Sequence, residues 1–178
     1  MRTIGSSFPH VVLRRKPFPG RASPPRGASN AMKLSFLLWL SSLLPQTAAD
    51  PLCLATTVYL EARDQSTLGQ RAVAEVALRR QEDGRWGEST CDVVTAPHQF
   101  APSIVSPDYL VDSLDAWTKA MEIAFAAEDD WYAPQGLRRE LVPGASHFAV
   151  SSANPSWKSF PTVATIGSHT FYAVDRLH

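Results

Sequence analysis

The spacing of apolar side chains predicts two adjacent helices between residues 54 and 80. Residues 54–63 are apolar on most sides of a helix, which is typical of a buried helix. The second helix starts at Thr67, where Gln70 three residues later would complete a capping box. The positions of its apolar stripe, at helical spacing, are Leu68, Ala72, Val73, Val76 and Ala77.

A third helix follows Asp112, its predicted N-cap. We expect it to end before the acidic residues 128–130, because negative charge is unfavourable at a helix C-terminus. Its expected buried stripe consists of Leu114, Trp117, Met121, Ala124 and Phe125.

The pattern changes after residue 145. Residues 146–150 are strand-like, and residues 162–166 and 169–174 flank a two-residue turn that begins with Gly167, which predicts a β-hairpin. Helices followed by a small antiparallel sheet predict an α+β domain.

The N-terminal part has a different composition. Residues 1–31 are rich in Pro, Arg, Gly and Ser and are expected to be a disordered extension, with the true start at Met32. Residues 32–49 carry a lysine, a short apolar run and small residues, the order of a secretory signal peptide cleaved near Asp50. An uncleaved anchor helix is the alternative. Residues 50–178 then form the functional domain.

Charge separates the two parts further. Residues 1–49 hold seven basic and no acidic residues, so residues 50–178 hold ten basic and seventeen acidic residues. An acidic domain argues against nucleic acid and anionic lipid as partners. We expect an exported, monomeric protein of the periplasm or cell envelope, not inserted in the membrane after cleavage.

Export affects how the cysteines are interpreted. Cys53 and Cys91 are the only two, and an oxidising compartment favours a disulfide between them, which would stabilise the fold by about 4 kcal/mol. The alternative is that Cys53 is a thiolate nucleophile of a peptidase.

Two glutamates differ in their neighbours along the helix. Glu75 has Arg71 and Arg79 four residues away on either side, so it is expected to be a solvated surface acid. Glu61 has no cation three or four residues away, and its helix is apolar. Burial should raise its pKa and keep it protonated, the state that a general acid needs, although a structural carboxylate remains the alternative.

A metal site is not favoured by the spacing. The histidines after residue 50 occur singly, and a zinc site would need His147 and His169 to meet across paired strands together with further ligands. We therefore expect no metal and no cofactor.

Several motifs resemble the SleB-type cell wall hydrolases, the spore-cortex-lytic family. The stretch CLATTVYLEARDQSTLGQRAVAEVALRR is similar to the family's opening motif, and CDVV followed by Gln99 and Phe100 is similar to its middle segment. GASHFAVSSANPSW and ATIGSHTFY are similar to its closing motifs. The resemblance covers about residues 52 to 173.

The resemblance implies a lysozyme-like, mostly helical domain that cleaves peptidoglycan glycan strands, commonly as a lytic transglycosylase. The family's catalytic glutamate falls on Glu61. Candidates to line a sugar groove are Tyr59, Gln99, Phe100, His147, Trp157 and Tyr172, for each of which core packing is the alternative.

The sequence departs from the family pattern at three places. Asp64 and Gln65 replace a glycine and a second glutamate, Arg79 replaces an asparagine, and Leu60 precedes Glu61. The loss of the second glutamate leaves open a binding module that holds glycan without cutting it.

Overall fold

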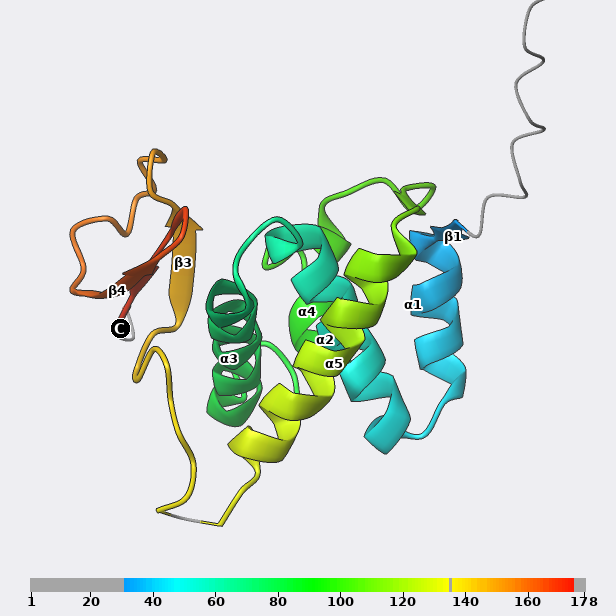
Figure 1. Ribbon diagram of the computed structural model, residues 1–178, viewed down its shortest axis with the longest axis horizontal. Coiled ribbons are helices and arrows are strands. Elements are labelled where there is room, and N and C mark those ends of the chain that lie inside the picture. The colour runs from blue at the N-terminus through cyan, green and yellow to red at the C-terminus, as the bar shows by residue number, and fades with distance from the viewer. Residues whose placement is uncertain (1–30, 135, 175–178) are drawn as a thin grey trace, which may run out of the picture.

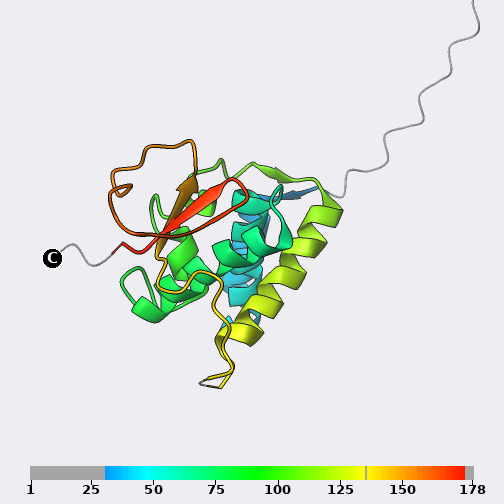
Figure 2. The same ribbon diagram turned by 60° about the vertical axis from the view of Figure 1, so that its left-hand side comes forward.

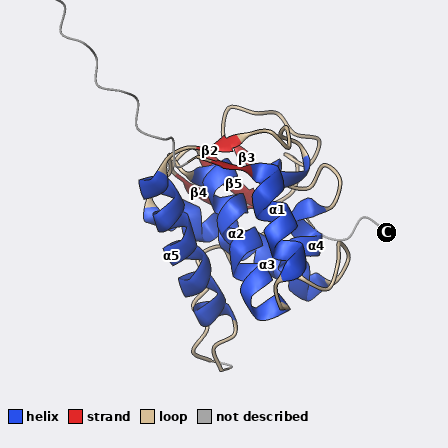
Figure 3. Ribbon diagram, turned by 90° about the vertical axis from the view of Figure 1, so that its right-hand side faces the viewer, coloured by secondary structure: helices blue, strands red, loops and turns tan. Residues whose placement is uncertain are grey.

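The computed structural model describes residues 31–134 and 136–174 (Figure 1). Five α-helices make up about half of the described chain, and the strands are short (Figure 3). The helices are α1 (Leu34–Leu43), α2 (Gln46–Ala62), α3 (Thr67–Asp83), α4 (Thr90–Thr95) and α5 (Leu114–Trp131), with a 3-10 turn η1 at Ala101–Ser103. The strands are β1 (Met32–Lys33), β2 (Leu110–Val111), β3 (His147–Val150), β4 (Thr162–Ile166) and β5 (His169–Tyr172). The predicted α+β class is confirmed.

Helix α2 lies at the centre of the helical body and contacts α1, α3, α4 and α5. Its apolar character on most sides fits this position, because every face meets another element. Fully buried side chains include Leu54, Val58, Val73, Val76 and Phe171. The core is therefore continuous from the helices to the last strand.

Helix α2 begins earlier than the sequence pattern indicated. It starts at Gln46 and contains Pro51, and Ala49 and Asp50 are buried. The segment predicted to be a signal peptide is folded here: β1 pairs with β2, and Leu34 and Leu37 of α1 are buried. Cleavage near Asp50 stays a prediction; it would remove β1, α1 and the start of α2.

Nothing in the described part of the chain forms a helix long and apolar enough to span a bilayer. The extension predicted over residues 1–31 lies, apart from its last residue, outside the described residues.

Two predicted helix starts are wrong by one residue. Ser66, not Thr67, is the N-cap of α3 and accepts a hydrogen bond from Gly69 N. Ser113, not Asp112, caps α5 and accepts from Ala116 N. In both cases a serine hydroxyl next to the expected residue takes the role.

Helix α5 also continues through residues 128–130, contrary to expectation. Burial of Ala127 and Trp131 on either side outweighs the cost of acidic side chains at the helix end, which is at most about 1 kcal/mol each. Three members of the predicted stripes are exposed, since they lie at the edge of the buried face: Leu68, Leu114 and Phe125.

The three-stranded sheet has the order β3-β5-β4, with both pairs antiparallel. The predicted hairpin of β4 and β5 is confirmed, and Gly167 in its turn has a φ of 60°, which favours glycine. The sheet lies beside α3, at the end of the body opposite α1 (Figure 1).

The predicted disulfide is confirmed. Cys53 on α2 and Cys91 on α4 are joined, with Cα atoms 5.2 Å apart. Cys53 is fully buried, and no free cysteine occurs in the chain. The alternative of a Cys53 thiolate nucleophile is therefore wrong.

Candidate active site

A cavity of about 250 Å³ lies where the helical body meets the sheet. Its lining comes from α2, α3, the segment after α4, β3 and the connection between β3 and β4: Glu61, Arg80, His98, Gln99, His147, Phe148 and Trp157. That connection loops out beyond the sheet (Figure 2). Residues far apart in the sequence thus converge on one cavity.

Glu61 lies in the last turn of α2 and is partly buried. Its Oε1 accepts a hydrogen bond of 2.7 Å from Ala101 N at the start of η1. Burial raises the pKa of Glu61, while the Ala101 hydrogen bond and the charge of Arg80 oppose the rise. The net direction keeps a proton on this carboxyl group at a higher pH than in water, as an acid catalyst requires.

The turn before η1 positions the backbone that contacts Glu61. His98 has a φ of 61°, which is uncommon for a residue other than glycine. Gln99 and Phe100 follow, and Ala101 N then faces Glu61. A strained residue that borders a cavity is a frequent feature of functional sites.

Arg80 is a buried cation in the wall of the cavity, 5% exposed. Its Nε donates to Ser146 O at 2.7 Å and its Nη1 donates to Gln99 Oε1 at 3.1 Å. Its guanidinium also lies over the rings of Trp86 and Phe100. Burial lowers its pKa to about 10, so the group stays charged at neutral pH.

His147 and Trp157 form an aromatic side of the cavity, with ring centroids 5.2 Å apart. Burial, followed by the charges of Arg80 and Arg85, lowers the pKa of His147 to about 4. A neutral imidazole at physiological pH can donate or accept a hydrogen bond without competing with Glu61 for protons. Rings and neutral polar groups are suited to a sugar ligand.

The structure divides the sugar-groove candidates into two groups. Gln99, His147 and Trp157 share the cavity with Glu61. Tyr59, Phe100 and Tyr172 do not line it: all three are buried, at 0%, 1% and 5% exposure. For these three, the alternative of core packing is the one that the structure supports.

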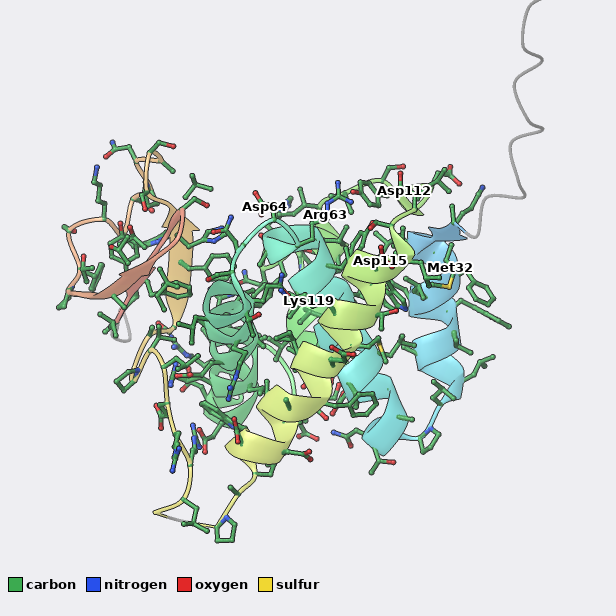
Figure 4. All side chains as sticks on the ribbon, viewed as in Figure 1. Met32, Arg63, Asp64, Asp112, Asp115 and Lys119 are labelled. Atoms are coloured by element: carbon green, nitrogen blue, oxygen red, sulfur yellow. A yellow bond between two sulfur atoms is a disulfide. The ribbon has the colours of Figure 1, made fainter. Side chains whose placement is uncertain are left out.

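Tyr59 packs against Trp117, and its hydroxyl accepts from Arg63 at 2.9 Å and donates to Asp112. Arg63 and Asp64, at the end of α2, and Asp112, before α5, lie at the same end of the helical body (Figure 4). Tyr59 thus ties α2 to the segment that precedes α5.

Arg80, His98 and Phe148 were not identified from the sequence. Arg80 continues the buried face of α3, at helical spacing from Val73, Val76 and Ala77. A cation on an otherwise apolar helix face was the available signal. His98 and Phe148 carry no comparable pattern, because their positions depend on the packing of loop and sheet.

The prediction that Glu75 is a solvated surface acid is wrong. Glu75 is 6% exposed and pairs with Arg79 at 2.9 Å. Its two oxygens also accept from Leu141 N and Val142 N, at 2.6 and 3.1 Å. Arg71, the other expected partner, pairs with Asp130 on α5. The segment after α5, which the helix pattern did not reveal, covers Glu75.

Two departures from the family pattern have structural roles. Gln65 Oε1 accepts from Ser168 N at 3.0 Å and so joins the α2–α3 connection to the β4–β5 turn. Arg79, besides its pair with Glu75, donates to Ala145 O at 2.7 Å. Leu60 is partly buried against the core.

The two histidines considered for zinc do not face each other across the sheet. His147 is paired with Tyr172, and His169 is paired with Val150. Within residues 31–134 and 136–174 there is no cluster of three or more His, Cys, Asp or Glu residues that could hold a metal ion.

Comparison of the sequence with family models assigns the chain to a family. No curated protein matches the chain. Among solved structures, the catalytic domain of Bacillus cereus SleB is similar at 23% identity and a TM-score of 0.48, over 86% of this chain and 98% of that one. A family model for cell wall hydrolases matches residues 64–172. The match starts just after Glu61 and contains the other residues of the cavity. Because it spans more than half of the sequence, the chain belongs to the cell wall hydrolase family.

Proposed function

We propose that this protein cleaves the glycosidic bond between N-acetylmuramic acid and N-acetylglucosamine in peptidoglycan, as a lytic transglycosylase with Glu61 as its single acid and base. Membership in the cell wall hydrolase family makes peptidoglycan the substrate. Our proposal adds the particular glycosidic bond that is cleaved, the transglycosylase mechanism and the catalytic role of Glu61.

One observation carries it: among the described residues that line the cavity, Glu61 is the only carboxylic acid. Ordinary glycosidases use two carboxyl groups on opposite sides of the scissile bond. A cavity with one acid favours a reaction in which the substrate supplies the nucleophile. The C6 hydroxyl of the muramic acid residue is suitably placed within the sugar to do this.

The proposed reaction has two proton transfers. Protonated Glu61 donates its proton to the glycosidic oxygen as the bond to C1 of muramic acid breaks. The resulting carboxylate accepts the proton of the C6 hydroxyl, whose oxygen bonds to C1 and closes a 1,6-anhydro ring. Glu61 ends protonated again, so no water is consumed and the acid is ready for another cycle.

The surroundings of Glu61 support both transfers. Burial makes the protonated form available for the first step. After that step, the Ala101 N–H and the charge of Arg80 favour the carboxylate. Gln99, His147 and Trp157 would hold the sugar rings, through their amide, imidazole and indole groups.

We also propose that the protein is exported and acts in the periplasm or cell envelope as a monomer that starts near Asp50. The disulfide is consistent with an oxidising compartment. N-terminal sequencing of protein recovered from the envelope tests the cleavage; a chain that still begins at Met1 or Met32 contradicts it.

Mass analysis of the products from purified peptidoglycan tests the reaction. Transglycosylation leaves 1,6-anhydro-muramic acid ends, whereas hydrolysis leaves reducing ends that are one water heavier. A folded protein that binds strands and releases no product would be a binding module instead.

A further inference from the structure

Two guanidinium groups lie against one indole ring beside the Glu61 cavity. The guanidinium carbons of Arg80 and Arg85 are 4.9 and 4.4 Å from the centroid of the Trp86 ring. Two like charges that share one ring repel each other, and the charge of Arg85 contributes to lowering the pKa values of both Arg80 and His147. The fold therefore maintains a local excess of positive charge at this place.

Protein groups offset this charge only in part. Both hydrogen bonds of Arg80 described above end on neutral acceptors, a carbonyl and an amide oxygen. Among the described residues, Arg80 forms no ion pair. Glu61 is the acid whose charge acts on Arg80, but the raised pKa of Glu61 favours its neutral form. Arg85 pairs with Asp83, and its side chain is 37% exposed.

Arg80 borders two cavities at once. One is the Glu61 cavity, and the other is an open groove of about 400 Å³ with Arg85 and Ser146 in its wall. The remaining charged groups of the groove all have partners: Glu82 pairs with Arg138, Arg79 pairs with Glu75 and Glu140, and Asp83 pairs with Arg85 itself. An anion in the groove would meet Arg80 and Arg85 as the cations best able to bind it.

We propose that Arg80 and Arg85 bind a carboxylate carried by the peptide substituents of the muramic acid residues, next to the bond that Glu61 cleaves. This inference rests on the proposed function, and it names the substrate form: strands that still carry their peptides, in preference to bare glycan. The planar forks of two guanidinium groups match the geometry of a carboxylate.

Arg85 is the better residue for a test. Arg80 is buried and bonded to β3 and to Gln99, so its replacement would also disturb the cavity. Arg85 is exposed at the surface of the groove. Arg71 is the matched control, because it is also a partly exposed arginine paired with an aspartate, and it lines neither cavity.

The experiment measures binding, with Glu61→Gln protein so that no strand is cut. Soluble glycan strands are prepared with their peptides intact or removed by an amidase, and dissociation constants are determined at low and at high salt. We expect peptide-bearing strands to bind about five- to tenfold more tightly at low salt, the scale of one or two partly exposed charge-assisted hydrogen bonds. Salt should reduce this preference, because the groove is open to solvent.

Adding Arg85→Gln should remove most of the preference, Arg85→Lys should retain part of it, and Arg71→Gln should leave it unchanged. Equal binding of both strands by the Glu61→Gln protein, or a preference that survives Arg85→Gln, overturns the proposal. Because binding requires no cleavage, this result is separate from the product analysis: failure of the Glu61 mechanism would leave the binding preference measurable.

Discussion

Two glutamates on neighbouring helices are shielded from water, Glu75 fully and Glu61 in part, and their carboxyl groups have different partners. Glu75 accepts two backbone N–H groups and pairs with Arg79. Glu61 accepts one backbone N–H, forms no ion pair within the described residues, and opens onto a cavity. The two carboxyl groups are distinguished mainly by the number of hydrogen-bond and ion-pair partners that each one has.

The difference indicates what each carboxyl group can do. A carboxylate held by an arginine and two N–H groups is a structural link, because transfer of a proton to it would weaken three interactions at once. A carboxyl group that burial disfavours as an anion, with few partners, can release and regain a proton at little structural cost. On this basis Glu61 is the catalytic candidate and Glu75 belongs to the scaffold.

The largest expected effect is on cleavage by Glu61→Gln. Glutamine keeps the shape of the side chain and an oxygen for Ala101 N, but it has no proton to transfer. Strand cleavage should fall by at least about 10³-fold, since acid–base catalysis by one group is worth about 10²- to 10⁴-fold and here one group serves twice. The melting temperature should remain within a few degrees of the parent value. Cleavage at a comparable rate would make Glu61 structural.

The reverse result is expected for Glu75→Gln. Loss of the Glu75 charge leaves Glu140 as the remaining ion-pair partner of Arg79 and weakens the hydrogen bonds from the backbone N–H groups of residues 141 and 142. We expect a loss of about 3 kcal/mol in unfolding free energy, or about 10 °C in melting temperature. The folded fraction should cleave strands at close to the parent rate. A stable Glu75→Gln protein without activity would invert the comparison.

Arg80→Met tests how the cavity sets the pKa of Glu61. Because the charge of Arg80 lowers that pKa, its removal should raise it further. A general acid works below its pKa, so the decline of activity at alkaline pH should move to higher pH in Arg80→Met. A purely structural role for Arg80 would reduce the rate at every pH and leave the position of the decline unchanged.

Glu128 on α5 provides the smallest and most specific control. Burial, together with Asp50 and Asp129, raises its pKa to about 7, yet it does not line the Glu61 cavity. The fold therefore favours its protonated form, and this contribution is lost as pH rises from 4.5 to 7. Glu128→Gln should be slightly more stable than the parent at pH 8, within about 1 kcal/mol after allowance for solvent screening, and equal to it at pH 4.5.

Cleavage by Glu128→Gln should match that of the parent at both pH values. A loss of activity in Glu128→Gln would mean that Glu128 takes part in function although it does not line the cavity.

The sequence indicated the local features well. The β4–β5 hairpin followed from alternation around Gly167, and the disulfide followed from the two cysteines of the chain. The absence of a lysine or arginine three or four residues from Glu61 could be read from the sequence, because a helix brings these positions together. The charge of Arg80, which reaches Glu61 from α3, could not.

Apart from the two helix N-caps, the errors share one cause, which is contact between distant segments. Glu75 has arginines at helical spacing, but residues 140–142 cover it, and Arg71 turns to Asp130 instead. Tyr59 and Phe100 have side chains suited to sugar and are nevertheless enclosed by the core. Arg80 reaches the cavity because Ser146, Trp86 and Gln99 come to it from three other parts of the chain.

The central claim is that burial outweighs the Ala101 hydrogen bond and the charge of Arg80 and so keeps a proton on Glu61, and a carboxyl NMR titration tests it most directly. Glutamate carboxyl carbons labelled with ¹³C would be followed with pH in the parent, in Glu61→Gln and in Glu128→Gln. The parent signal that disappears in Glu61→Gln, and the one that disappears in Glu128→Gln, should both titrate above the ordinary value of 4.5. If the signal that disappears in Glu61→Gln titrates at or below 4.5, Glu61 is an ordinary carboxylate and the account is contradicted.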